Sequence, residues 1–208
     1  MPEQLRRLSQ LLAGGPVRIG ELRLWRAEDG SFRVCHVGDF GAGVASLQAF
    51  DQVDDAREIA KFTEDGSYRV LKAGRDLRRG WILCLPDAEA VAQALEFFYP
   101  AALGQWLAAE RGKIRIIPFR EVLGRQSGIY RVSQGLDERG MDEVVTARCR
   151  AQCLRRRLWL EGGFLTDETA LAQTEGSIPL VCSEACSLLI ADAARAVAAA
   201  TKNAEGDA

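Results

Sequence analysis

Histidine is almost absent from this chain of 208 residues, which contains only His36. Sites that bind metal through two or more histidines, as in zinc hydrolases and chelatase pockets, therefore cannot be built from this chain alone. A Ser-His-Asp triad would have to use His36. The alternating sequence around it, FRVCHVGD, is more typical of a strand that carries a histidine at the edge of the core.

Long apolar runs and strong net charge are also missing. No stretch approaches the roughly 18 apolar residues that cross a membrane, and the start MPEQLRRLSQLLAGG carries charge where a signal peptide has an apolar segment. We therefore expect a cytoplasmic protein without a membrane span. The 27 Lys and Arg residues and 29 Asp and Glu residues give a net charge of −2, which argues against a nucleic-acid-binding surface.

The periodicity of the apolar residues changes along the chain. Residues 17–39, 67–74 and 78–87 have strand-like patterns, with a hairpin expected at Asp29-Gly30. From residue 87 the pattern is helical, interrupted at Pro100, with further helices expected over about 137–153 and from about residue 183.

These patterns predict an α+β fold. A strand-rich N-terminal subdomain is expected over residues 1–85, followed by a mainly helical four-cysteine cluster-binding subdomain over 86–201. Residues 202–208 are expected to form a disordered tail.

Four of the six cysteines form two pairs with the same spacing, Cys149 with Cys153 and Cys182 with Cys186. Residues four apart share one face of a helix. Ser183 is a candidate N-cap that would place Cys186 in the first turn of the last helix, where free backbone N–H groups favour a thiolate. Two such pairs brought together would give a four-thiolate cage suited to zinc or to an iron–sulfur cluster.

Spacing and charge separate the alternatives only in part. Disulfides are rare in a reducing compartment, and structural zinc usually uses C-x₂-C turns, whereas C-x₃-C pairs on helices suit a larger cluster. Thiol redox chemistry, or core cysteines beside a solvated helix face, are further alternatives. Five arginines near the first pair could compensate the negative charge of a thiolate cage: Arg148, Arg150, Arg155, Arg156 and Arg157.

The segment GRQSGIYR adds two candidate cofactor-binding residues. Arg125 could pair with a cluster or with a ligand carboxylate, and Gln126 could supply an orienting hydrogen bond. The alternative is an exposed polar loop before a strand.

Six stretches together resemble a known family: LRLWRAEDGSFRVCH, LRRGWILCL, LEFFYPAALGQW, PFREVLGRQSGIYRV, CLRRRLW and IPLVCSEACSLLIADAAR. They are similar to the C-terminal region of chelatase-like multidomain proteins of the sirohydrochlorin chelatase type, in which a small stabilising domain precedes a four-cysteine [4Fe–4S] domain. The resemblance covers about residues 16–200. It implies that the cluster ligands are Cys149, Cys153, Cys182 and Cys186. The metal-inserting half of such proteins, with its histidine ligands, has no counterpart in these residues, so the resemblance does not imply chelatase activity.

The leading hypothesis is a non-catalytic [4Fe–4S] protein that transfers electrons or senses redox state. As an accessory module of tetrapyrrole (sirohaem or cobalamin) metabolism, it would have a chelatase-type or other tetrapyrrole-pathway protein as its partner. One alternative is a zinc-stabilised Cys₄ interaction module that uses the basic helix Arg148–Arg157. A second is an enzyme that uses the cluster on a bound tetrapyrrole.

Overall fold

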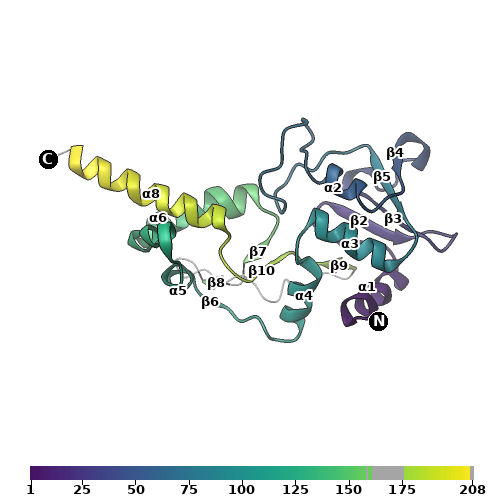
Figure 1. The fold of residues 1–208 in the computed structure, drawn as a ribbon, viewed down its shortest axis with the longest axis horizontal. Helices are drawn as coiled ribbons and strands as arrows, with labels where there is room; N and C mark the ends of the chain where they lie inside the picture. The colour runs from purple at the N-terminus through teal and green to yellow at the C-terminus, as the bar shows by residue number, and fades with distance from the viewer. Residues whose placement is uncertain (158, 161–175, 207–208) are drawn as a thin grey trace.

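The computed structural model describes residues 1–157, 159–160 and 176–206, which form an elongated molecule with a sheet at one end and a group of helices at the other (Figure 1). The sheet has six strands in the order β4-β5-β3-β2-β1-β9. Their bounds are β1 (Val17–Ile19), β2 (Leu22–Arg26), β3 (Phe32–His36), β4 (Gln48–Phe50), β5 (Trp81–Leu85) and β9 (Ser177–Ile178).

The four strands from β1 to β5 through β2 and β3 are antiparallel, whereas β4 and β9 join the two edges in parallel. The hairpin predicted at Asp29-Gly30 is confirmed, because it connects β2 to β3. Gly30 has a φ of 85°, in the left-handed region that glycine adopts without steric cost. Two short 3₁₀ segments follow β3, namely η1 (Val37–Asp39) and η2 (Val44–Ser46).

Four helices complete the N-terminal half: α1 (Glu3–Ala13), α2 (Asp55–Ile59), α3 (Ala88–Phe98) and α4 (Ala102–Glu110). They share one apolar core with the sheet. In that core Trp81 stacks on Phe98 with ring centroids 5.3 Å apart. The predicted division near Pro100 is confirmed, since α3 and α4 are separate helices, and the Asp87 carboxylate caps α3 by accepting a hydrogen bond from the Ala90 amide.

The strand predicted over residues 67–74 is wrong. This segment belongs to a loop between α2 and β5 that has only isolated bridges, such as Phe62 with Tyr68. Exposed and buried side chains do alternate here, but the apolar ones face the solvent: Tyr68 and Val70 are exposed, and Arg69 is buried. Because the Arg69 guanidinium donates to backbone carbonyls of the loop, a side chain supplies hydrogen bonds that a neighbouring strand would otherwise provide.

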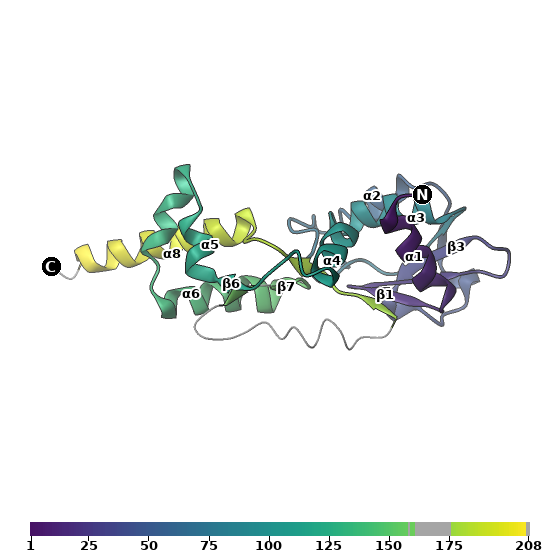
Figure 2. The ribbon, with the colours of Figure 1, turned by 90° about the horizontal axis from the view of Figure 1, so that it is seen from below.

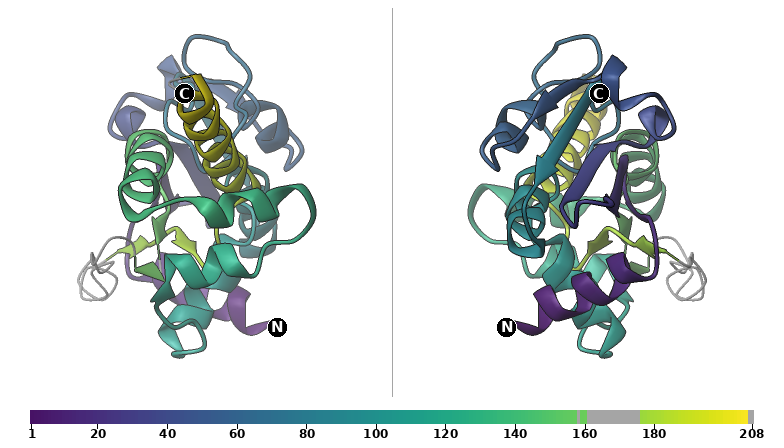
Figure 3. Two further views of the ribbon diagram at one scale, coloured as in Figure 1. Left: turned by 90° about the vertical axis from the view of Figure 1, so that its left-hand side faces the viewer. Right: turned by 90° about the vertical axis from the view of Figure 1, so that its right-hand side faces the viewer.

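The C-terminal half packs helices around a second, smaller core. Its helical elements are α5 (Phe119–Gly124), the 3₁₀ segment η3 (Gly128–Gly135), α6 (Glu138–Val145), the π-helical segment η4 (Thr146–Arg150) and α8 (Ser187–Gly206). Its short strands are β6 (Ile117–Pro118), β7 (Arg156–Arg157), β8 (Trp159–Leu160) and β10 (Val181–Cys182). Helix α8 runs away from the sheet (Figure 2), and in the left view of Figure 3, along the long axis, it lies in front of the sheet.

The predicted α+β class is confirmed: a strand-rich N-terminal region precedes a helical C-terminal region. Helices α3 and α4 pack on the first core, so the boundary between the two cores lies after α4. The division into independent subdomains over residues 1–85 and 86–201 remains a prediction. The backbone of α8 is helical to Gly206, inside the segment predicted as a tail, because the alanine-rich sequence before it favours continuation of the helix. Residues 207–208 lie outside the described residues. No helix in the described ranges is long and apolar enough to span a membrane.

Candidate metal centre

The four paired cysteines surround a single pocket between the two cores. Cys149 lies in the π-helical segment η4, Cys153 follows it, Cys182 ends β10, and Cys186 immediately precedes α8. The cavity has a volume of about 440 Å³. The four thiols, predicted to form one cage, are therefore brought together at one cavity by segments that are distant in the sequence.

Backbone amides point at two of these sulfurs. The Arg155 N–H donates to the Cys153 Sγ at 3.4 Å, and the Leu189 N–H donates to the Cys186 Sγ at the same distance. The Cys182 thiol donates to the Glu184 carbonyl at 2.8 Å. Hydrogen bonds from amides stabilise negative charge on the sulfur that accepts them.

The predicted N-cap at Ser183 is wrong, because α8 begins at Ser187. Residues 183 and 184 instead form a bend after β10, and Cys186 takes the N-cap position by accepting from the amide of Leu189, three residues on. The consequence for the site is small but favourable. The thiol of Cys186, rather than a serine hydroxyl, receives the free N–H groups and the partial positive charge of the helix start.

Without a bound cation, three of the four thiols hold their protons firmly. Burial raises the pKa of Cys149 to about 12 and that of Cys182 to about 12, and it also raises the pKa of Cys153. Repulsion from the other cysteines contributes to each shift, because each thiolate would lie in the field of the others. A bound metal centre reverses this situation, since its positive charge favours thiolates and binding releases protons.

Three of the five neighbouring arginines line the pocket. Arg148 forms an ion pair with Asp192, and this hydrogen bond raises the pKa of Arg148. Arg155 donates to the Gln105 side chain and to the carbonyls of Val181 and Pro100, at 2.7–2.9 Å. The positive charge of Arg157 partly offsets the effect of burial on the pKa of Cys149. Arg150 and Arg156 are outside the pocket lining.

Arg125 and Gln126, predicted as cofactor-binding residues, do not line the pocket. The Arg125 guanidinium pairs with Glu121 at 2.5 Å, and the Gln126 side-chain amide donates to the Val122 carbonyl at 3.3 Å. Both side chains thus bond back to the helix that precedes them, α5, which accounts for their orientation. Their cofactor-binding role remains a prediction.

Residues of the N-terminal half also line the pocket, and none of them was a candidate from the sequence. They are Leu71, Lys72 and Ala73 of the loop before β5, together with Pro100 and Gln105 at α4. No sequence motif marks these positions, because their role depends on contacts between distant segments. A chemically suggestive pattern exists only for the cysteines and the arginines.

The donor set around the cavity consists of thiols, which as thiolates bind zinc or an iron–sulfur cluster. Within the described parts of the chain, no three His, Cys, Asp or Glu side chains converge closely enough to hold a single metal ion. The four thiols are instead distributed around the cavity, with cationic groups beside them. Four thiolates around a space of this kind match the coordination of an iron–sulfur cluster.

Two family models together account for most of the chain. Residues 2–110 match the model described as the DR2241 stabilising domain, and residues 111–195 match the model described as a 4Fe-4S iron-sulfur cluster binding domain. No curated protein matches the chain.

Among solved structures, the chain is similar to the crystal structure of DR2241 from Deinococcus radiodurans, at 28% sequence identity and a TM-score of 0.78. That structure is described as a multi-domain protein with structural similarity to chelatases but also with two additional novel domains. The match covers 94% of this chain and 41% of DR2241. The chain therefore corresponds to less than half of that protein.

Proposed function

This chain belongs to the family of the DR2241 stabilising domain, and we propose that it is a redox module whose [4Fe–4S] cluster is held by Cys149, Cys153, Cys182 and Cys186. The observation that carries the proposal is the meeting of all four thiols at one cavity. The match of residues 111–195 to a 4Fe-4S cluster binding domain supports the choice of metal centre.

The side chains and amides around the cavity have distinct parts in this proposal. The amides of Arg155 and Leu189 stabilise negative charge on two of the ligand sulfurs. Arg155 and Arg157 add positive charge beside the thiolates. A bound [4Fe–4S] cluster supplies a centre that accepts and releases single electrons. Because nearby cations and N–H···S bonds favour the more negative, reduced form, these groups are expected to raise the reduction potential.

We further propose that the chain acts with a chelatase-like protein or another protein of tetrapyrrole metabolism. The support is the description of DR2241 as a multi-domain protein with structural similarity to chelatases, of which this chain matches 41%. Its one histidine does not provide a multi-histidine insertion site, so the chain would serve such a partner as an accessory module. The cytoplasm fits this role, since four free thiols persist there for cluster assembly.

The proposal is tested by anaerobic reconstitution with iron and sulfide. The wild-type chain is expected to bind about four irons and four sulfides and to show a broad absorbance band near ~400 nm. Serine replacements at Cys149, Cys153, Cys182 and Cys186, one at a time, are expected to reduce the iron content. Cys84→Ser is the matched control, because Cys84 lies on β5 outside the pocket lining.

Two results would contradict the proposal. One is a colourless protein with a single bound zinc, which would favour the zinc-stabilised interaction module. The other is full cluster content in all four serine variants, which would place the metal centre elsewhere. A redox role requires in addition that the bound protein bleaches on reduction and recovers its absorbance on reoxidation.

A further inference from the structure

A loop of the N-terminal half is bonded to the chain on both sides of Cys153. Gly74 and Cys153 form an isolated antiparallel bridge. On one side of Cys153, the Leu154 amide donates to the Ala73 carbonyl at 2.9 Å, and on the other the Arg75 amide donates to the Gln152 carbonyl at 3.3 Å. Because both neighbouring peptides are fixed, the backbone that carries the Cys153 thiol cannot shift without breaking bonds to this loop.

The same contact directs an amide at the sulfur. The peptide after Leu154 carries the Arg155 N–H that donates to the Cys153 Sγ. The loop therefore fixes both the position of the thiol and one hydrogen bond to it. Such bonds to ligand sulfurs influence the stability and the potential of a metal centre.

Gly74 is required for this close approach. Its φ is outside the left-handed region, so the backbone itself would accept another residue. A Cβ at this position would however lie 2.8 Å from the Leu71 carbonyl oxygen and 3.3 Å from the Gln152 carbonyl oxygen. Neither atom belongs to a flexible side chain, so an added methyl group must displace the loop backbone at Leu71 and press on the Gln152 carbonyl next to Cys153.

Arg69 holds the loop from inside. Its side chain is only 4% exposed, and its guanidinium donates to the carbonyls of Gly74 at 2.5 Å, Lys72 at 3.3 Å and Ala60 at 3.4 Å. One charged side chain thus joins α2, through the residue that follows it, to the part of the loop that contacts Cys153. Buried hydrogen bonds of a charged donor are costly to remove, because the carbonyls are left without partners.

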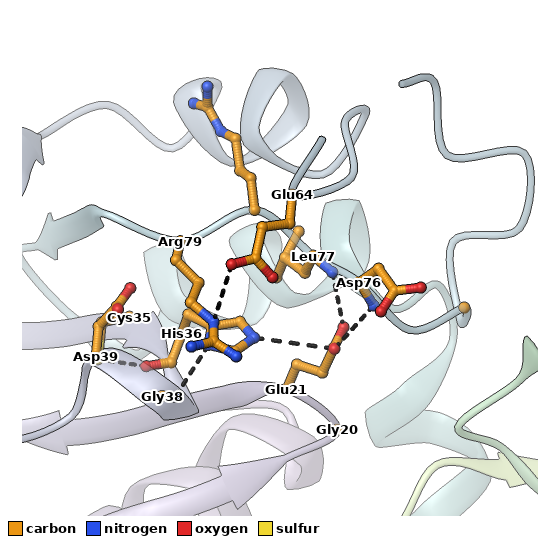
Figure 4. A network of polar contacts seen from close by, with 12 residues as sticks. Gly20, Glu21, Cys35, His36, Gly38, Asp39, Glu64, Asp76, Leu77 and Arg79 are labelled. Carbon is orange, nitrogen blue, oxygen red and sulfur yellow. Dashed lines mark hydrogen bonds and ion pairs between the residues drawn. The ribbon is translucent and has the colours of Figure 1, made fainter. Parts of the chain in front are cut away.

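Glu21 anchors the other end of the loop. Its two carboxylate oxygens accept from the amides of Asp76 and Leu77 at 2.9 and 3.1 Å (Figure 4). The imidazole of His36 lies behind the carboxylate, with Nε2 3.9 Å from Glu21 Oε1. A carboxylate and a guanidinium therefore restrain the loop at its two ends, which gives a rigid wall rather than a free surface segment.

We propose that residues 69–75 are part of the cluster site, and that Arg69 and Gly74 are positioning residues that act on the cluster through Cys153. This inference rests on the proposed role of Cys153 as a ligand. It assigns to the N-terminal half a direct function at the metal centre, in addition to its own stability. Leu71, Lys72 and Ala73 of the same loop already line the cavity.

The test uses the full chain with its reconstituted cluster and compares Gly74→Ala and Arg69→Met with the wild type. Both variants are expected to lose iron to a chelator about tenfold faster, the size of effect that residues supporting a ligand commonly have. The EPR spectrum of the reduced protein is expected to change as well, whereas Arg69→Lys, which keeps a charged donor, is expected to retain the cluster better than Arg69→Met.

Gly43→Ala is the matched control, because Gly43 is in the same half, has a φ outside the left-handed region, and would have no atom within 4 Å of an added Cβ. Wild-type rates of iron loss and an unchanged EPR spectrum in both Gly74→Ala and Arg69→Met would overturn the inference and leave the proposed function intact. A wild-type chain that takes up no cluster would overturn the proposed function itself, and this is seen before any variant is compared.

Discussion

The two cores of the molecule are built in different ways. The first combines a sheet with four helices around large side chains that are almost fully buried, among them Trp81, Phe98 and Tyr99. The second is smaller, and the partly buried cysteines Cys149, Cys182 and Cys186 pack against it. Burial alone can account for the stability of the first core, whereas the second borders a cavity whose thiols repel one another as thiolates. The comparison predicts that the C-terminal half depends on the proposed cluster for its stability and that the N-terminal half does not.

Cys149→Ala should produce the largest difference between the halves. The substitution is expected to abolish the cluster and with it the contribution of metal binding to folding, which is about 10 kcal/mol or more for structural zinc in zinc-finger peptides. Hydrogen exchange followed by mass spectrometry should show lost protection in α6 and α8 and retained protection in β2, β3 and β5. Cys84→Ala should keep the cluster. A Cys149→Ala protein that retains a full cluster would contradict the assignment of this ligand.

Trp81→Ala should affect the opposite half. Replacement of a buried tryptophan with alanine costs about 3–5 kcal/mol, and here it also removes the stacking on Phe98 and the hydrogen bond from the indole N–H to the Arg78 carbonyl. Thermal unfolding of the metal-free protein should show the loss. Trp25→Ala is the comparison variant, since Trp25 is only partly buried and should cost less. Equal losses would show that the first core is not organised around Trp81.

Arg155→Ala tests the connection between the cores. Its guanidinium joins Pro100 and Gln105 to Val181, so its removal should cost about 1.5–3 kcal/mol, typical of hydrogen bonds to a charged group. Unfolding of the cluster-bound protein should become less cooperative. The neighbouring Arg156→Ala should leave the cluster and the unfolding transition unchanged, because Arg156 is exposed and outside the cavity lining. Similar behaviour of the two variants would contradict a specific role of Arg155.

Glu21→Gln should have the smallest effect, and one that depends on pH. Burial favours a higher pKa for Glu21, but hydrogen bonds with His36, Leu77 and Asp76 outweigh it and hold the pKa below the usual range of a glutamate. A carboxylate with a lowered pKa stabilises the fold above the unfolded-state pKa, and this contribution is lost as the pH falls through the folded-state pKa.

The difference in unfolding free energy between wild type and Glu21→Gln, measured with urea, should therefore be about 1 kcal/mol at neutral pH. It should decrease as the pH falls below about 4.5. A difference that did not decrease as the pH fell through the folded-state pKa of Glu21 would show that the negative charge of Glu21 does not restrain the loop.

Local sequence signals predicted much of the fold. The Asp29-Gly30 hairpin and the break at Pro100 each depend on the preference of a few neighbouring residues, and the repeated C-x₃-C spacing identified the four thiols that meet at the cavity. The prediction for residues 67–74 is wrong because an alternation of polar and apolar residues does not show which of them are buried. Here the charged Arg69 is buried, whereas Tyr68 and Val70 are exposed.

Contacts between distant segments could not be predicted in this way. The lack of a side chain at Gly74 matters because the Gln152 carbonyl lies close to it. Nothing near either residue in the sequence shows that the two are in contact. The same holds for Ser183 and Cys186. Local preference favours Ser183 as the N-cap, whereas the path of the chain after β10 places the start of α8 after Cys186.

Strand β9 belongs to the second half of the sequence but lies at the edge of the first half's sheet, where Ser177 and Ile178 pair with Arg18 and Ile19. A gene cut between α4 and β6 would therefore leave the sheet with an open edge at β1, a known route to aggregation. The two halves can be recognised separately along the chain, yet separating them would remove an edge strand from the sheet of the first half. We therefore expect the two halves to occur together in one chain.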